Sequence, residues 1–290
     1  MLPEFIERRV GNVSIRLHPA FLDPAFVTRL ADPDLFFHDP GCEIVKDQKK
    51  IKVGRLTVTV ADSPRSVYVK RYNAFSLRYK IASPFARSGA WRALRGAAIL
   101  GAANIPTATP VAAVERRMRG VLTGSFLISE EIAGGATVDA YWRERLQPIP
   151  GRAGFCRRRR FLSALAGLFR SLHEQNIYHD DLKDANILAV PDGAERVESF
   201  FLLDLEGVRR CSTLSERRRI KNLVQLERTL GRHLRRVDRL VFLKNYLDAS
   251  FTDLRLRRKR LETILAAARR LDRAKARAAR RDGAKTFRRV

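Results

Sequence analysis

The residues best suited to do chemistry lie in one stretch, 178–188, which reads Tyr-His-Asp-Asp-Leu-Lys-Asp-Ala-Asn-Ile-Leu. Its Asp181 could accept the proton of a hydroxyl nucleophile, and Asn186, five residues later, could reach a magnesium ion held by phosphates. Lys183 is placed to meet charge that builds on a transferred phosphoryl group, and His179 would support the turn from behind. This spacing predicts phosphoryl transfer to a hydroxyl, with Asp181 and Lys183 as catalytic residues.

The same residues could also form an ordinary polar loop with solvated carboxylates, and a short motif match alone does not distinguish the two. The stretch resembles the catalytic loop of protein kinases, a fold that requires a helix before the loop and strands after it. It also requires a metal-binding Asp and a Lys on a distant upstream strand. The helix is indicated by apolar residues at helical spacing, namely Phe161, Leu162, Leu165, Leu168, Phe169 and Leu172.

A candidate metal ligand follows the loop at the end of an apolar strand. Two apolar runs within 187–203 flank a turn expected at 191–193, and the second run ends in Asp-Leu-Glu-Gly. This ending resembles the metal-binding Asp-Phe-Gly segment of kinases, so Asp204 is predicted to bind magnesium with Asn186. The alternative for Asp204 is a strand-end cap or turn residue, and Glu206 is an ambiguous second carboxylate.

The candidate nucleotide-binding lysine lies on a strand far upstream. Period-two alternation predicts a strand that ends at Val60, and a second β-rich run covers 66–72, after a turn at 61–65. In a kinase fold Lys70 would bind the α- and β-phosphates of ATP from this strand. The alternative is a solvated position on an amphipathic strand.

The loop expected to cover the phosphates, residues 46–50, is poor in glycine. It has no Gly-x-Gly-x-x-Gly pattern, and Gly54 is the one glycine near it. We therefore expect backbone amides around Gly54, with Lys49 or Lys50, to hold the phosphates.

Residues 88–103 predict a short helix with Trp91, Leu94, Ala98 and Leu100 on its buried side. A kinase normally pairs its strand lysine with a glutamate on this helix, but no acidic residue occurs between positions 80 and 114. Either the pair is absent, or Glu115 or another acid supplies it from elsewhere.

A strand over 125–132 followed by two glycines predicts a hinge between two lobes. The backbone from Glu130 to Ile132 is placed to bind the adenine edge. The carboxylates of Glu130 and Glu131 are as well explained as plain turn residues.

The composition describes partners more than it describes a fold. The chain of 290 residues carries 57 basic and 31 acidic residues, for a net charge of +26, which favours anionic partners such as nucleic acid, an anionic membrane or a phosphorylated substrate. Its three cysteines are far apart, as expected for free thiols in a reducing compartment. The N-terminus lacks the layout of a signal peptide, and no apolar run approaches 18 residues. We expect a cytoplasmic or peripheral protein.

Two basic segments have competing interpretations. Residues 255–289 contain fifteen Lys or Arg and three acids, so this helical tail is either solvated or attached to an anionic leaflet. The run Arg157–Arg160 is either a solvated charge cluster or an anion contact.

Several segments together resemble the lipopolysaccharide kinase family, the Kdo and heptose kinases of the lipopolysaccharide core. The resemblance covers about 40–250, and its more particular marks are Val69-Lys70-Arg71-Tyr72, Ile105-Pro106-Thr107 with Pro110, and Phe242-Leu243 with Tyr246-Leu247. It implies an α+β, bilobed protein-kinase-like fold that uses ATP with Mg²⁺. The expected parts are an N-terminal extension (1–40), a β-rich N-lobe (41–132), a helical C-lobe (133–250) and a basic helical tail (251–290).

The resemblance also implies an acceptor and a location. We expect a kinase that phosphorylates a sugar hydroxyl of an anionic glycolipid, the lipopolysaccharide inner core, at the cytoplasmic face of the bacterial inner membrane. One rival is a protein kinase with a nucleic-acid- or ribosome-associated substrate, and nucleic acid is the weaker candidate partner. Another rival is a non-catalytic membrane-binding scaffold, which the missing helix glutamate would suit.

Overall fold

The computed structural model describes residues 4–73, 87–191 and 198–287. The chain divides into two compact units, residues 1–133 with 202–209 and residues 134–201 with 210–290, and each is described here by itself. Most of the turn expected at 191–193 lies outside the described residues.

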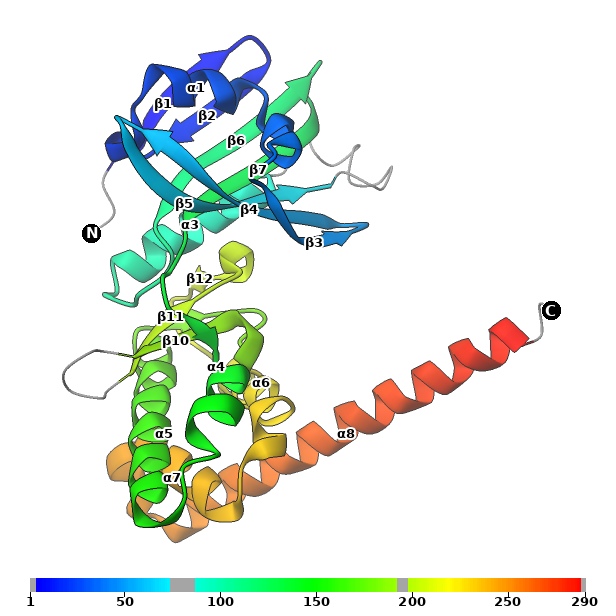
Figure 1. The fold of residues 1–290 in the computed structure, drawn as a ribbon. Helices are drawn as coiled ribbons and strands as arrows, with labels where there is room; N and C mark the ends of the chain where they lie inside the picture. The colour runs from blue at the N-terminus through cyan, green and yellow to red at the C-terminus, as the bar shows by residue number, and fades with distance from the viewer. Residues whose placement is uncertain (1–3, 74–86, 192–197, 288–290) are drawn as a thin grey trace. The chain divides into compact units, whose positions relative to one another are not determined.

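A seven-stranded antiparallel sheet forms the first unit (Figure 1), in the order β1-β2-β6-β7-β5-β4-β3. Its strands are β1 (Ile6–Val10), β2 (Val13–Leu17), β3 (Glu43–Gln48), β4 (Ile51–Val60), β5 (Ser63–Tyr72), β6 (Pro110–Met118) and β7 (Val121–Glu130). Strand β5 pairs with β4 on one side and β7 on the other, so Lys70 lies on a central strand.

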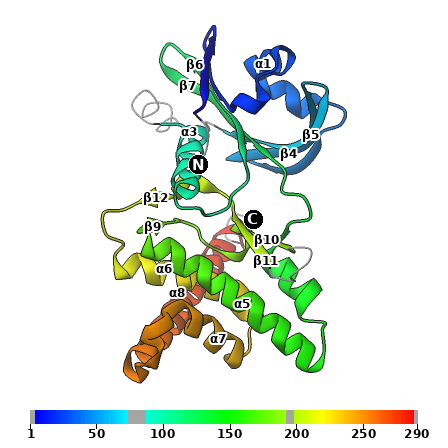
Figure 2. The ribbon, with the colours of Figure 1, turned by 90° about the vertical axis from the view of Figure 1, so that its left-hand side faces the viewer.

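The two faces of this sheet are covered by different helices (Figure 2). Successive residues of a strand point to opposite faces. Val114 therefore belongs to the same core cluster as Phe26 of α1 (Pro24–Ala31), while its neighbour Ala113 belongs to a second cluster with Leu94 of α3 (Gly89–Gly101).

Residues 1–40 are not a separate extension. Strand β2 lies inside the sheet between β1 and β6, and the short 3₁₀ helices Pro19–Phe21 and Pro33–His38 place Phe21 and Phe36 in the same core as Leu56. The sequence pattern did not predict that residues 1–40 belong to the sheet and its core, because their apolar residues are spread over five short elements.

Two predicted loops are shorter in the structure. Strand β3 continues to Gln48, which leaves a two-residue turn in place of the loop expected at 46–50. The turn expected at 61–65 contracts to Ala61 and Asp62, with φ of 47° and 61°. Positive φ at both positions suits a tight hairpin between twisted strands, so Pro64 lies within β5.

Helix α3 begins after Ser88, whose hydroxyl accepts a hydrogen bond from the Trp91 amide at 3.2 Å. Leu94 and Leu100 are buried as predicted, but Ala98 is exposed. The buried face is instead lined by small residues, Ala90, Ala93, Gly96 and Ala97, which let the helix approach its neighbours closely.

The second unit is mostly helical. Its main helices are α4 (Val138–Tyr141), α5 (Gly151–Glu174), α6 (Glu216–Glu227), α7 (Arg236–Leu247) and α8 (Leu254–Phe287), and a π-helical turn spans Trp142–Leu146. Short 3₁₀ turns cover Asp184–Asn186, Leu230–His233 and Asp248–Thr252. The strands β8 (Ala136–Thr137), β10 (Ile187–Pro191) and β11 (Glu198–Leu202) form a small sheet, and β9 (Ile177–Tyr178) leads into residues 178–188, the predicted catalytic stretch.

Half of the basic run Arg157–Arg160 is used inside the second unit. Arg157 forms an ion pair with the buried Glu198, and Arg158 donates to the backbone carbonyls of Leu146 and Ile149, each at 3.1 Å. These two arginines therefore support the fold.

Within the described residues, no helix combines the length and apolar character needed to cross a membrane. The three cysteines are free thiols, as predicted.

Candidate active site

The first group of candidate residues lies in the β-rich unit and surrounds Lys70. The ammonium nitrogen of Lys70 donates to Asp204 Oδ1 at 2.6 Å and to Glu206 Oε1 at 3.1 Å. Two carboxylates from one short segment therefore hold the lysine. The predicted nucleotide site depends most on this contact between Lys70 and Asp204.

Asp204 has an unusual backbone conformation. Its φ and ψ are 57° and 55°, in the left-handed region, immediately before the 3₁₀ turn η5 (Leu205–Gly207). Non-glycine residues rarely adopt this conformation, and it is retained where surrounding structure determines it. Helix α3 provides such a constraint, since a Cβ on Gly96 would lie 2.3 Å from the Leu205 carbonyl oxygen.

Tyr72 closes the buried side of this group. Burial, followed by the nearby charges of Glu206 and Asp204, raises the pKa of its phenol well above the ordinary value. The Lys70 ammonium lies 4.8 Å from the centre of its ring, a favourable distance for a cation–π contact. Tyr72 is therefore a neutral packing partner for the lysine.

The second carboxylate bound to Lys70 is Glu206 and not Glu115. Glu115 is buried, and it binds Arg117 at 3.1 Å and the Ser88 amide at 3.3 Å. Glu206 accepts from Lys70 and also from Arg92 of α3 at 3.2 Å. The sequence contained one signal of these contacts, the second carboxylate in the Asp-Leu-Glu-Gly segment.

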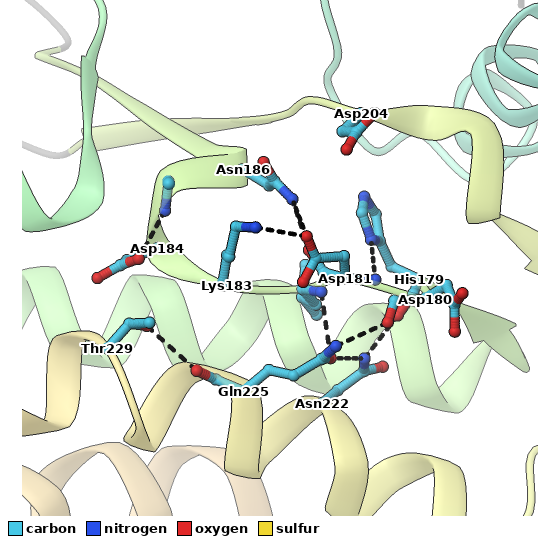
Figure 3. A network of polar contacts seen from close by, with 12 residues as sticks. His179, Asp180, Asp181, Lys183, Asp184, Asn186, Asp204, Asn222, Gln225 and Thr229 are labelled. Atoms are coloured by element: carbon cyan, nitrogen blue, oxygen red, sulfur yellow. Dashed lines mark hydrogen bonds and ion pairs between the residues drawn. The ribbon is translucent and has the colours of Figure 1, made fainter. Parts of the chain in front are cut away.

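The second group lies in the helical unit and forms the catalytic stretch (Figure 3). The Asp181 carboxylate accepts from Lys183 Nζ at 2.6 Å and from Asn186 Nδ2 at 3.1 Å. Asn186 Nδ2 also donates to the Asp181 backbone carbonyl at 2.7 Å. These bonds bring all three predicted residues of the loop together, with the Asp181 carboxylate partly exposed to solvent.

Two buried side chains, His179 and Asp184, lie within the stretch 178–188. His179 is 1% exposed, and its Nδ1 accepts a hydrogen bond from the Asp181 amide at 3.2 Å, which is the supporting role predicted for it. Asp184 is also buried, and this burial is the main cause of its raised pKa.

Helix α6 supplies two supports that sequence reasoning missed. Asn222 donates to the His179 carbonyl at 2.6 Å, and Gln225 donates to the Asp180 carbonyl at 2.7 Å while accepting from the Leu182 amide at 3.2 Å (Figure 3). The available signal was a pair of side-chain amides about one helical turn apart, Asn222 and Gln225, among the apolar residues Leu223, Val224 and Leu226.

Gly54 does not lie in a phosphate-covering loop. It is buried within β4, where an added Cβ would lie 2.6 Å from Cys42 Sγ and 3.1 Å from a Phe37 ring carbon. Its lack of a side chain serves packing against these two residues. The β3–β4 turn consists of Lys49 and Lys50, so these lysines are the remaining candidates at that position.

In the predicted hinge, the side chains of Glu130 and Glu131 form ion pairs and their backbone amides form hydrogen bonds. Glu130 pairs with Arg65 at 3.5 Å and Glu131 pairs with Arg55 at 2.9 Å, as plain surface carboxylates do. The Glu130 amide donates to the Thr109 carbonyl at 2.9 Å. The Ile132 backbone has no hydrogen-bond partner among the residues that the structure describes.

The two predicted metal ligands have suitable chemistry. Mg²⁺ prefers oxygen ligands and is commonly held by one or two protein groups together with substrate phosphates. Asp204 offers a carboxylate, and Asn186 uses its amide nitrogen for Asp181, which leaves its oxygen for a cation. The described residues contain no group of three or more His, Cys, Asp or Glu side chains that could hold a metal alone.

Comparisons with known proteins agree with a kinase-like fold. A solved structure, described as "WaaP in complex with acyl carrier protein", matches with a TM-score of 0.57 and 23% identity over 86% of this chain and 98% of that chain. No match is found among curated proteins. The family model described as "Lipopolysaccharide kinase (Kdo/WaaP) family" matches residues 42–246. The chain therefore belongs to the lipopolysaccharide kinase family, whose members are phosphotransferases acting on sugar hydroxyls.

Proposed function

We propose that this protein transfers the γ-phosphoryl group of ATP to a sugar hydroxyl of the lipopolysaccharide inner core. The observation that carries the proposal is that the family match spans both groups of candidate residues, from Lys70 to Asp204. Two independent features support it: the Lys70–Asp204 contact and the hydrogen-bonded Asp181, Lys183 and Asn186.

In the proposed mechanism each residue has one task. Lys70 binds the α- and β-phosphates, and the Ile132 backbone binds the adenine edge. Asp181 accepts the proton of the sugar hydroxyl as the hydroxyl oxygen attacks the γ-phosphorus. The bond from this phosphorus to the β,γ-bridging oxygen breaks, ADP leaves, and Lys183 neutralises charge on the transferred group. Asp204 and Asn186 are the residues that would hold Mg²⁺, which would offset the negative charge of the phosphates when bound.

We further propose that the protein acts at the cytoplasmic face of the bacterial inner membrane, held there by α8. The helix is basic along its length, and Arg269, Arg270 and Arg273 are exposed. Ile264 and Ala268 are buried, and Asp272 accepts from Arg228, the residue that follows α6, at 2.8 Å, so the helix is anchored to its unit as far as Asp272. This anchoring leaves the arginines available for anionic lipid.

The test is incubation with ATP, Mg²⁺ and purified core glycolipid, followed by mass analysis of the lipid. We expect phosphate on a core sugar with the wild type and a large loss with Asp181→Asn. Labelled phosphate on polypeptide, with the lipid unchanged, would select the protein-kinase rival. A wild-type chain that binds no Mg-ATP in calorimetry would select the non-catalytic scaffold.

A further inference from the structure

We propose that Glu206 is the positioning residue for Lys70, in the place that a helix glutamate takes in other kinases, and that Arg92 fixes Glu206. This inference rests on the proposed function and extends it to the group that orients the ATP-binding lysine. It concerns residues of the first unit only.

The two oxygens of Glu206 are divided between two cations. Oε1 accepts from Lys70 Nζ at 3.1 Å, and Oε2 accepts from Arg92 NH2 at 3.2 Å. Helix α3 carries no acidic residue, so the usual arrangement is inverted. Here the helix contributes the cation, and the segment after the metal-binding aspartate contributes the acid.

Asp204 alone is a poor partner for Lys70 during catalysis. Its carboxylate accepts from Lys70 at 2.6 Å in the structure, but the same carboxylate is the proposed magnesium ligand. A carboxylate bound to a divalent cation attracts a nearby ammonium less strongly. Glu206 keeps its charge for Lys70 in that state, so the lysine stays directed at the phosphates.

The segment that carries Glu206 is held in one position. Gly96 of α3 approaches the Leu205 carbonyl so closely that no side chain fits between them. On the other side, Thr107 Oγ1 donates to the Leu202 carbonyl at 2.6 Å and the Leu202 amide donates to the Pro106 carbonyl at 3.0 Å. Contacts on both sides therefore define where the Glu206 carboxylate lies.

Arg92 has a second contact that restricts it. Its NH1 donates to the Arg87 carbonyl at 3.0 Å, just before α3 begins, while NH2 reaches Glu206. The guanidinium is thus held at both ends. Because Arg92 is fixed, it holds Oε2 of Glu206 in place, and Oε1 stays directed at Lys70.

The experiment is a double-mutant cycle on the full chain, with affinity for Mg-ATP as the readout. The variants are Glu206→Gln, Glu206→Asp, Lys70→Met and the Lys70→Met/Glu206→Gln pair. Asp34→Asn is the matched control, because Asp34 is similarly half-buried and also binds two arginines, Arg71 at 2.8 Å and Arg116 at 3.3 Å.

We expect Glu206→Gln to weaken Mg-ATP binding about tenfold or more, since it removes the charge from the hydrogen bond between Glu206 and Lys70. Glu206→Asp should recover part of the loss, and Asp34→Asn should bind as the wild type does. In the Lys70→Met background, Glu206→Gln should change the affinity less than about twofold, because the lysine through which it acts is gone.

Normal binding by Glu206→Gln would overturn the inference. So would an equal loss in both backgrounds, which would indicate that Glu206 acts on magnesium directly. A wild-type chain that binds no Mg-ATP would overturn the proposed function and this inference together. Binding by the wild type with an unaffected Glu206→Gln variant overturns the inference alone.

Discussion

Asp181 makes the sharpest prediction at the scale of single residues. Its carboxylate is held by Lys183 and Asn186, so asparagine there keeps an acceptor for both donors but loses the ability to take a proton. We expect Asp181→Asn to lower kcat by about 10²- to 10⁴-fold, the usual contribution of a general base. Single-turnover transfer from ATP measures it.

The neighbouring Asp180 is the control for this substitution. Its carboxylate binds Tyr178 Oη at 3.1 Å and Lys221 at 2.9 Å, away from the two donors that hold Asp181. Asp180→Asn should therefore retain turnover within a few-fold of the wild type. Equal losses for the two variants would remove the assigned role from Asp181.

His173 makes a prediction about pH. Burial lowers the pKa of its imidazole to about 4, and its ring nitrogens contact Tyr246 Oη at 2.8 Å and Asn222 Oδ1 at 3.3 Å. The folded state keeps this histidine neutral, whereas the unfolded chain protonates it below about pH 6.5. Stability is therefore lost as the pH falls through that value, and the loss is complete below about pH 4.

Between pH 7.5 and pH 5 this linkage lowers the free energy of unfolding by about 2 kcal/mol. Urea unfolding of the wild type and of His173→Gln at both pH values measures the effect. The variant is less stable at neutral pH, but it should lack this part of the pH dependence. Parallel pH profiles for the two proteins would contradict the assignment.

At the scale of elements, the contact between α3 and η5 is the most sensitive to change. Alanine normally favours a helix over glycine by about 1 kcal/mol, yet a Cβ at Gly96 would lie 2.3 Å from the Leu205 carbonyl oxygen. We expect Gly96→Ala to cost about 1–3 kcal/mol of stability by overpacking. It should also lower Mg-ATP affinity, because η5 must move with Asp204.

Gly167, inside α5, is the matched control. A Cβ there would meet no atom within 4 Å, so Gly167→Ala should be neutral or stabilising by up to about 1 kcal/mol. Thermal unfolding and nucleotide titration of both variants test the pair. A Gly96→Ala variant that matches Gly167→Ala in both measurements would show that the close contact yields easily.

Elements with strong periodicity or a local motif could be predicted from the sequence. The helix over 161–172, the strand of Lys70 and the catalytic stretch all depend on residues close together in the chain. Gly54 was misplaced because a glycine in a strand and one in a loop look alike until Cys42 and Phe37 are seen against it. Glu206 was left without a role because its partners, Lys70 and Arg92, lie more than a hundred residues upstream.

At the scale of the whole molecule, the net charge of +26 is unevenly distributed along the chain. Many arginines of the folded units are neutralised internally, as Arg157 is by Glu198 and Arg239 is by Glu227 at 3.0 Å. Residues 255–289, about an eighth of the chain, carry +12 of this net charge. This distribution favours a long-range attraction to an anionic surface through one helix.

That arrangement predicts how the protein binds vesicles. Each basic residue near an anionic leaflet contributes about 1 kcal/mol, and salt screens the attraction within about 10 Å at 0.1 M. Replacing Arg269, Arg270 and Arg273 by glutamine should weaken binding to phosphatidylglycerol vesicles by roughly 100-fold. Rising salt should release the wild type.

The control removes the same charge from the other unit. Arg8, Arg9 and Arg119 are exposed there, and their replacement by glutamine lowers the net charge equally. If attachment depends on α8, this control should keep nearly all of its vesicle affinity in co-sedimentation. Equal losses of vesicle affinity would mean that the total charge alone attracts the chain to lipid. Binding to RNA without binding to vesicles would indicate that α8 contacts nucleic acid.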